Sequence, residues 1–176
     1  MYKRQVYIAD GYANRRIIVF DSDTGAFRRM WGAYGGKPAD TPPRGSPRRQ
    51  FSTPVHCVKL ARDGLVYVCD RRNDRVQVFR KDGHFVSEFS VAPRTAGMGS
   101  VWDLDFSADA AQRLMFVADG TNNLVHILRR TDGASIDTFG APGQFAWLHG
   151  LVIDSSGNLF TAEVHDAKCV RKFVPR

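Results

Sequence analysis

The chain has 176 residues, of which 43% are hydrophobic and 11% aromatic, so it is long enough to bury a core and is not a disordered tail. Its 25 Lys and Arg against 18 Asp and Glu give a net charge of +7, but the basic residues are scattered as doublets. Scattered doublets are typical of a solvated rim, which makes nucleic acid a less favoured partner. No apolar stretch reaches the roughly 18–20 residues that cross a membrane, so no membrane partner is expected.

The N-terminal sequence "MYKRQVYIADGY" becomes polar too early for a secretory signal peptide. Further along, Cys57, Cys69 and Cys169 show no C-x-x-C spacing, which argues against a zinc ribbon. Their odd number argues against a complete disulfide framework. We interpret the three cysteines as buried thiols, with one disulfide as the alternative.

Four segments of the chain repeat one template, with an apolar and aromatic run, an acid, a polar turn and a second apolar run. In chain order they are "VYIADGYANRRIIVF", "VYVCDRRNDRVQVF", "MFVADGTNNLVHIL" and "LFTAEVHDAKCVRKF". Short β-rich runs separated by turn residues predict hairpins.

Additional strands are expected on both sides of these hairpins. In the first three copies, a turn containing Asp and Gly leads to a third run. Before copies two to four lies another apolar run: "PVHCVKLA", "SVWDLDFS" and "WLHGLVID". The unit is thus a four-stranded antiparallel meander of roughly 45 residues, typical of a propeller blade.

We therefore predict an all-β fold, a β-propeller of four blades in a single domain over residues 1–176. The first copy lacks its leading strand and the fourth its last, so the terminal blades would expose strand edges and apolar surface. We expect a fragment of a larger ring that is missing two blades, and the alternatives are two chains that complete each other or an unusually small ring. The predicted blades are residues 3–31, 51–91, 98–140 and 145–176. A Gly-, Pro- and Arg-rich loop is expected between the first two blades, at residues 32–50.

The repeated template resembles the NHL-repeat family of β-propellers, and this resemblance implies four blades of a six-bladed ring. The family signature places an acid and an arginine on either side of the hairpin turn, as in Asp10 and Arg16 or Asp70 and Arg75. An ion pair between them would lock the hairpin. In copies three and four Leu124 and Cys169 stand at the arginine position, so no such pair is expected there.

Two predicted inner strands carry a histidine at the same position, His56 in "PVHCVKL" and His149 in "WLHGLVI", and the blade between them has Trp102 there. Inner strands line the channel of a propeller. Three imidazoles around such a channel make a facial zinc site with an open position. Lone channel histidines bonded to backbone or water are the alternative.

The sequence "GYANRR", followed by "FSTPVH", "VCDRRNDR" and the second channel histidine, is also similar to the peptidyl-α-hydroxyglycine α-amidating lyase family and its bacterial relatives. This resemblance implies cleavage of a peptide-like carbinolamide to a peptide amide and glyoxylate, by a secreted or periplasmic protein. It implies His56 and His149 as two of three zinc ligands, the third not being in this chain, and the carbonyl of Val58 as a calcium ligand.

The same resemblance assigns Arg16 to substrate binding and catalysis, because a guanidinium can hold the carboxylate of a glycine-derived substrate. The tyrosine that the family uses as a base falls at Phe116, which has no ionisable hydroxyl. Tyr12 or Tyr34 would have to replace it. His165, in "AEVHDAKC", is expected at the same blade end as Tyr12 and is a second candidate for acid-base chemistry.

Two other hypotheses remain open. A non-catalytic NHL module would bind a protein or RNA partner through its basic rim, or another copy of itself through the open blades. A calcium-dependent lactonase-like propeller would need a cluster of Glu, Asn and Asp in the channel, for which the sequence offers Asp103.

Overall fold

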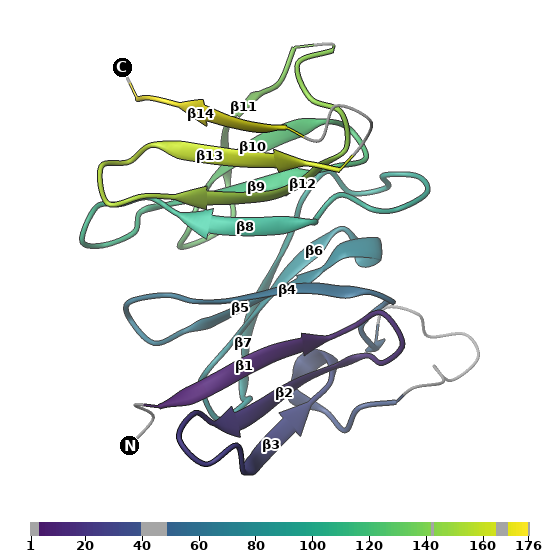
Figure 1. Cartoon of the computed structure of the whole chain (residues 1–176). Helices are drawn as coiled ribbons and strands as arrows, with labels where there is room; N and C mark the ends of the chain where they lie inside the picture. The colour runs from purple at the N-terminus through teal and green to yellow at the C-terminus, as the bar shows by residue number, and fades with distance from the viewer. Residues whose placement is uncertain (1–3, 40–48, 142, 165–168, 176) are drawn as a thin grey trace.

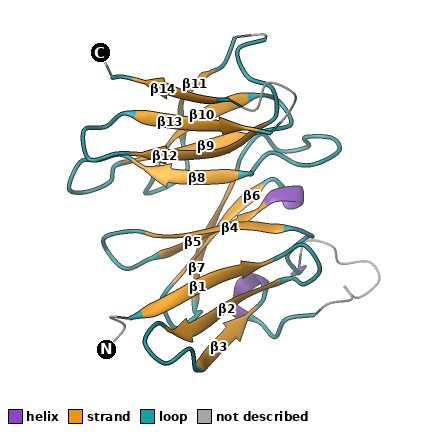
Figure 2. Ribbon diagram, in the orientation of Figure 1, coloured by secondary structure: helices purple, strands orange, loops and turns teal. Residues whose placement is uncertain are grey.

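The computed structural model describes residues 4–39, 49–141, 143–164 and 169–175. In these residues the chain forms antiparallel sheets, with short 3-10 turns at η1 (Ala33–Gly35) and η3 (Arg71–Asn73) (Figure 2). Figure 1 shows the sheets stacked in chain order, with the two termini at opposite ends of the stack. No helix among the described residues is long and apolar enough to span a membrane.

Each sheet is one blade, and the strands follow one another in space as they do in sequence. Blade 1 contains β1 (Gln5–Asp10), β2 (Arg16–Asp21) and β3 (Phe27–Trp31). Blade 2 contains β4 (Val55–Leu60), β5 (Val66–Asp70), β6 (Arg75–Phe79) and β7 (Phe85–Ser90). Blade 3 contains β8 (Asp103–Phe106), β9 (Leu114–Asp119), β10 (Leu124–Arg129) and β11 (Ser135–Phe139). Blade 4 contains β12 (Leu148–Ile153), β13 (Leu159–Glu163) and β14 (Val170–Phe173).

This arrangement confirms the predicted fold class. The two middle blades are complete four-stranded meanders, and the two terminal blades have three strands each among the described residues. The stack does not close into a ring in this chain, because blades 1 and 4 lie at its two ends (Figure 1).

Apolar clusters fill the space between consecutive blades. Blades 1 and 2 meet around Trp31 and Phe79, blades 2 and 3 around Tyr67 and Met115, and blades 3 and 4 around Phe145, among other residues. Because blade 2 is covered on both faces, every residue of β5 and β6 is buried. Strands of the terminal blades instead alternate between covered and exposed residues, as expected for a sheet with one free face.

In all four blades, the acid that ends the first strand of the repeated hairpin has a side-chain partner. Arg16 donates to Asp10 over 2.8 Å and Arg75 to Asp70 over 2.7 Å, as predicted. The expectation that no ion pair forms is wrong for blade 4, and in blade 3 a hydrogen bond from a histidine takes its place. There the partners stand two residues further along the strand, where a side chain points to the same face of the sheet: His126 on Asp119 at 3.0 Å, and Arg171 on Glu163 at 2.7 Å.

The structure contains the disulfide that the sequence left as an alternative. Cys57 on β4 lies directly opposite Cys69 on β5, with their Cα atoms 4.8 Å apart, and the two sulfurs are bonded. Such a cross-strand pair cannot be found from sequence spacing, because it depends on the register of the two strands. Cys169 is a free thiol.

Candidate functional site

Both channel histidines lie at a β-bulge at the start of an inner strand. The pairing of β4 with β5 shifts by one residue at His56, and the pairing of β12 with β13 shifts by one residue at His149. A bulged residue leaves the strand ladder, so its side chain can be aimed elsewhere. The two imidazoles, which come from blades 2 and 4, meet with their ring centroids 4.8 Å apart.

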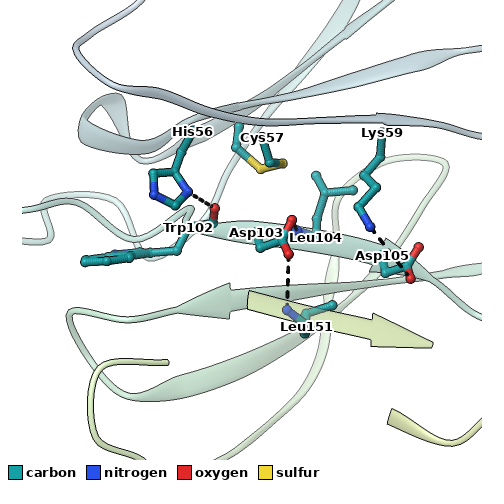
Figure 3. Close-up of a disulfide and its surroundings, with 9 residues drawn as sticks. His56, Cys57, Lys59, Trp102, Asp103, Leu104, Asp105 and Leu151 are labelled. Carbon is teal, nitrogen blue, oxygen red and sulfur yellow. Dashed lines mark hydrogen bonds and ion pairs between the residues drawn. A yellow bond between two sulfur atoms is a disulfide. The ribbon is translucent and has the colours of Figure 1, made fainter. Parts of the chain in front are cut away.

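Trp102 occupies the matching position of blade 3 and completes an aromatic cluster. Its ring centroid lies 5.6 Å from that of His56 and 5.5 Å from that of His149. The backbone carbonyl of Trp102 accepts a hydrogen bond from Nδ1 of His56 (Figure 3). Side chains at the beginnings of three consecutive inner strands therefore meet in one place, which we call the axial cluster. It consists of His56, Trp102, His149 and the two neighbours Tyr12 and Arg71 described below.

The hydrogen bond to Trp102 fixes the tautomer of His56. A carbonyl can only accept, so Nδ1 carries the proton and Nε2 presents a lone pair. The hydroxyl of Tyr12, on the turn between β1 and β2, lies 3.1 Å from this Nε2 and donates to it. Tyr12 is 70% exposed, so the lone pair of His56 points toward the accessible end of the cluster.

Both histidines are held neutral. Burial, together with the positive charge of Arg71 and the nearby His149, lowers the pKa of His56 to about 4, against the opposing effect of the Trp102 carbonyl. Burial, together with Arg71, also lowers the pKa of His149. At neutral pH the two rings are therefore uncharged, which is the form that binds metals.

Arg71 is a member of the cluster that the sequence did not single out. It follows β5 directly, in η3, and only 2% of its surface is exposed. Its guanidinium carbon lies 4.3 Å from the centroid of the Trp102 ring. Burial lowers the pKa of this arginine, whereas interaction with the Tyr12 hydroxyl raises it. Arg71 thus lies beside all the ring-bearing residues of the cluster.

A glycine in the preceding blade makes room for each histidine-bearing strand. A Cβ on Gly11 would lie 2.1 Å from the carbonyl oxygen of Val55, and a Cβ on Gly120 would lie 2.6 Å from that of Leu148. Both glycines directly follow the acid of the repeat, Asp10 and Asp119. In blade 2 this position is Arg71, and the inner strand that follows carries Trp102 instead of histidine. The signal that marks Arg71 is therefore an arginine at a repeat position that is glycine in blades 1 and 3 and Val164 in blade 4.

Acids on the inner strand of blade 3 join it to its neighbours (Figure 3). Asp103 accepts from the amides of Leu104 at 2.9 Å and Leu151 at 3.1 Å, and Asp105 lies 4.0 Å from the Lys59 ammonium. Burial raises the pKa of Asp103. The carboxylate that the lactonase-like hypothesis requires is thus occupied by backbone amides.

A family model for the NHL repeat matches residues 55–79, which form β4, β5 and β6. The chain contains an NHL repeat. Over 175 residues it is 29% identical to peptidyl-glycine alpha-amidating monooxygenase B of Xenopus laevis, covering 96% of this chain and 19% of that protein. It is 29% identical over 188 residues to NHL repeat-containing protein 3 of Homo sapiens, covering 97% of this chain and 46% of that protein. The NHL-repeat chain thus spans about a fifth of the first relative and about half of the second.

Solved structures support the propeller fold. Virginiamycin B lyase of Staphylococcus aureus, crystallised with quinupristin, superposes with a TM-score of 0.62 at 14% identity, over 99% of this chain and 53% of that one. The WD40 β-propeller domain of Doa1 superposes with a TM-score of 0.64 at 10% identity, over 94% of this chain and 46% of that one. At these identities the likeness establishes the fold alone.

The other predicted site residues that the structure describes have partners outside the axial cluster. Arg16 pairs with Asp10, and no contact recorded among the described residues joins it to the axial cluster. Val58 lies in β4 against the core between blades 1 and 2, and Phe116 packs between blades 3 and 4. His165 falls outside the described residues.

Within the part of the chain that the structure describes, no three His, Cys, Asp or Glu side chains gather as a metal site. The imidazoles of His56 and His149 are nevertheless adjacent, neutral and, for His56, fixed in tautomer. The axial cluster therefore supplies two nitrogen donors, a phenol and a guanidinium around one point.

Proposed function

We propose that this chain is part of a zinc-dependent lyase-type propeller related to the amidating enzymes, with His56 and His149 as metal ligands. The observation that carries the proposal is the meeting of two bulged imidazoles from blades 2 and 4. Similarity along almost the whole chain to an amidating monooxygenase supports the same class of chemistry.

The donor chemistry fits zinc. Histidine ligands of metals usually donate their second ring nitrogen to a carbonyl or carboxylate, and His56 does so to the Trp102 carbonyl. Catalytic zinc sites keep three protein ligands and an open position. The axial cluster provides two of these ligands, so a further donor has to complete the set. When bound, zinc would act as a Lewis acid that polarises a substrate oxygen.

The residues of the chain itself would handle the proton and the orientation of the substrate. We assign proton transfer to Tyr12, because its hydroxyl lies at the accessible side of His56 and Phe116 has no hydroxyl to offer. Arg16 and Asn14 both hold Asp10 at the base of the turn that carries Tyr12. Arg16 therefore acts as a positioning residue for Tyr12.

The proposed substrate is a peptidyl-α-hydroxyglycine, which would be cleaved to the peptide amide and glyoxylate. Calcium binding at the carbonyl of Val58 and an acid-base role for His165 are further parts of this proposal.

The experiment combines metal analysis with an assay for glyoxylate. We expect zinc to copurify or to rebind after chelation, and both His56→Ala and His149→Ala to lower zinc content and activity together. His84→Ala is the matched control, because His84 is an exposed histidine in the turn before β7. Zinc content that is unchanged in both cluster variants would contradict the proposal.

A second function is favoured by the free faces of the terminal blades. Val6, Ile8 and Met30 are exposed on blade 1, as are Val152 and Val170 on blade 4. A pocket on the blade 4 face is lined almost entirely by apolar residues, among them Val152, Phe160 and Val170. Exposed apolar faces of this kind mark interaction surfaces.

These two faces are complementary in the same way as the faces inside the stack. Val6 and Ile8 stand in the repeat where Val66 and Val68 stand in blade 2, and those two valines pack against blade 1. On blade 4, Val170 stands where Ile17 stands in blade 1, and Ile17 packs against blade 2. A blade 4 face of one chain can therefore pack on a blade 1 face of another as consecutive blades do.

We therefore propose that, if the binding function holds, the occupant of these faces is a second copy of this chain. The chain covers 53% of the virginiamycin B lyase chain and 46% of the Doa1 propeller chain, so two copies match the size of one such propeller. Light scattering should show a dimer that Val152→Glu and Val170→Glu each convert to a monomer. Val86→Glu, on an exposed valine of β7, is the control and should leave the dimer intact. A wild-type monomer at all concentrations would contradict this second function.

A further inference from the structure

We propose that Arg71 is the anion-binding group of the axial cluster and that it takes a monoanionic carboxylate between Tyr12, Trp102 and the two histidines. The identity of the carboxylate as part of a lyase substrate rests on the proposed function. Binding of the anion itself requires only the residues of the cluster.

Arg71 is a buried charge without a countercharge among the described residues. Arg71 is 98% buried, its Nε has no hydrogen-bond partner, and none of the ion pairs recorded among the described residues includes it. Arg75, four residues later and also buried, shows the contrast, because it pairs with Asp70 at 2.7 Å and with Glu88 at 3.1 Å. A buried charge without a countercharge is strongly unfavourable. A buried guanidinium nitrogen that lacks a partner therefore calls for a ligand to satisfy it.

A second feature of this charge is its place in the repeat. The matching residues of blades 1 and 3 are Gly11 and Gly120, which allow the next inner strand to approach closely. Between blades 2 and 3 the close approach is made from the other side of the joint, by Gly99, whose Cβ would lie 2.1 Å from the carbonyl oxygen of Arg71. At this joint the residue after the acid can therefore carry a side chain, and Arg71 places its guanidinium against Trp102.

A third feature is the surroundings of this charge. The guanidinium of Arg71 carries a permanent positive charge, and one carboxylate would balance it. The guanidinium offers a fork of donors that matches a carboxylate, and the Tyr12 hydroxyl lies beside it. Trp102, stacked on the guanidinium, forms an apolar wall.

This assignment differs from the one that the sequence suggested. Arg16 was expected to hold the substrate carboxylate, but its Nε is bonded to Asp10 in the same frame that Arg75 forms with Asp70. Arg71 is instead stacked on the Trp102 ring, which both imidazoles contact. The carboxylate and the metal would then be bound side by side in one cluster.

The test is a titration of the chelator-treated chain with glycolate, a small hydroxy acid, followed by NMR of the Trp102 indole and the His56 ring. We expect saturable shifts of both signals. Arg71→Gln should weaken glycolate binding about tenfold or more, as is usual for the loss of a charged hydrogen-bonding partner. Arg72→Gln removes the exposed neighbouring arginine and should bind glycolate like the wild type.

A further variant and a second anion complete the experiment. Arg71→Lys keeps the charge without the fork, so it should bind with intermediate affinity, and it replaces Arg71→Gln if that variant does not fold. Wild-type protein that shows no saturable shift with glycolate would overturn the proposal, as would an Arg71→Gln variant that binds normally. Tighter binding of inorganic phosphate than of glycolate would also contradict it. If zinc does not bind but glycolate does so through Arg71, the proposed zinc chemistry fails and the anion site stands.

Discussion

The joints between consecutive blades differ in one residue, and the difference organises the axial cluster. Where blade 1 meets blade 2, and where blade 3 meets blade 4, the residue after the repeat acid is a glycine and the next inner strand carries a histidine. Where blade 2 meets blade 3, that residue is Arg71 and the next inner strand carries Trp102. The cluster thus depends on space at two joints and on a charge at the third.

The largest effect is expected from filling the space at the histidine joints. In Gly11→Ala the new Cβ would lie 2.1 Å from the Val55 carbonyl oxygen, so backbone would have to move next to His56. Because a backbone atom cannot give way as a side chain does, we expect a loss of about 3 kcal/mol or more in the free energy of unfolding. Chemical denaturation would measure it.

Gly36→Ala is the matched control for this change. Gly36 is exposed, and a Cβ there would approach one oxygen at 3.4 Å, within ordinary contact. We expect its free energy of unfolding to stay within about 0.5 kcal/mol of the wild type. Equal stability of the Gly11 and Gly36 variants would show that the first joint is not tight.

A second, smaller effect is expected from the disulfide beside His56. Cys57 directly follows the bulge of His56, whereas the matching positions beside His149, Gly150 and Ala162, hold no such bond. The bond closes a short loop, so removing it should cost about 3 kcal/mol or less. In Cys57→Ser with Cys69→Ser, the NMR signals of the His56 ring should move more than those of the His149 ring.

Cys169→Ser serves as the control for this prediction, because Cys169 is free and lies on blade 4. Its substitution should leave the His56 ring unchanged. Equal shifts of the two histidine rings after loss of the disulfide would mean that the bond does not act locally on the bulge.

The smallest effect is the response of His56 to acid. Its pKa in the folded chain is about 4, below the usual value of 6.5, so the unfolded state binds more protons between these two values. Stability should therefore be complete at neutral pH and should fall as the pH drops from about 6.5 toward 4. Because the ring is only partly buried, we expect a loss on the order of 1–2 kcal/mol.

Denaturation at several pH values, in the wild type and in His56→Gln, measures this contribution. The variant should show a flatter dependence on pH over this range. A His56 ring that titrates near pH 6.5 by NMR would contradict the burial and hydrogen bonding that hold it neutral.

Much of the fold was accessible from the sequence because the repeats carry it. Four copies of one hairpin template predicted the four sheets, and their shared register placed His56 and His149 on inner strands. The sequence did not predict the partners of Asp119 and Glu163, because His126 and Arg171 act from two residues beyond the expected position. Strand register, which no local pattern states, was also needed to see this pairing.

The two histidines of the site were predicted from the sequence, whereas the buried charge of Arg71 was not. Arg71 belongs to a row of basic residues in "DRRNDR", and nothing in such a row tells a buried arginine from an exposed one such as Arg72. Contact with Trp102 comes from the next blade and depends on how the blades pack. The gap in the glycine pattern of the repeats is the signal that would have identified Arg71.

A titration with cobalt(II) tests most directly whether His56 and His149 bind one metal ion together. The visible spectrum of this ion reports its ligands. The account predicts that His56→Ala and His149→Ala each remove the same absorption bands, and that the double variant weakens binding little more than either single variant. Independent, additive losses from the two substitutions, or bands that survive in both single variants, would contradict it.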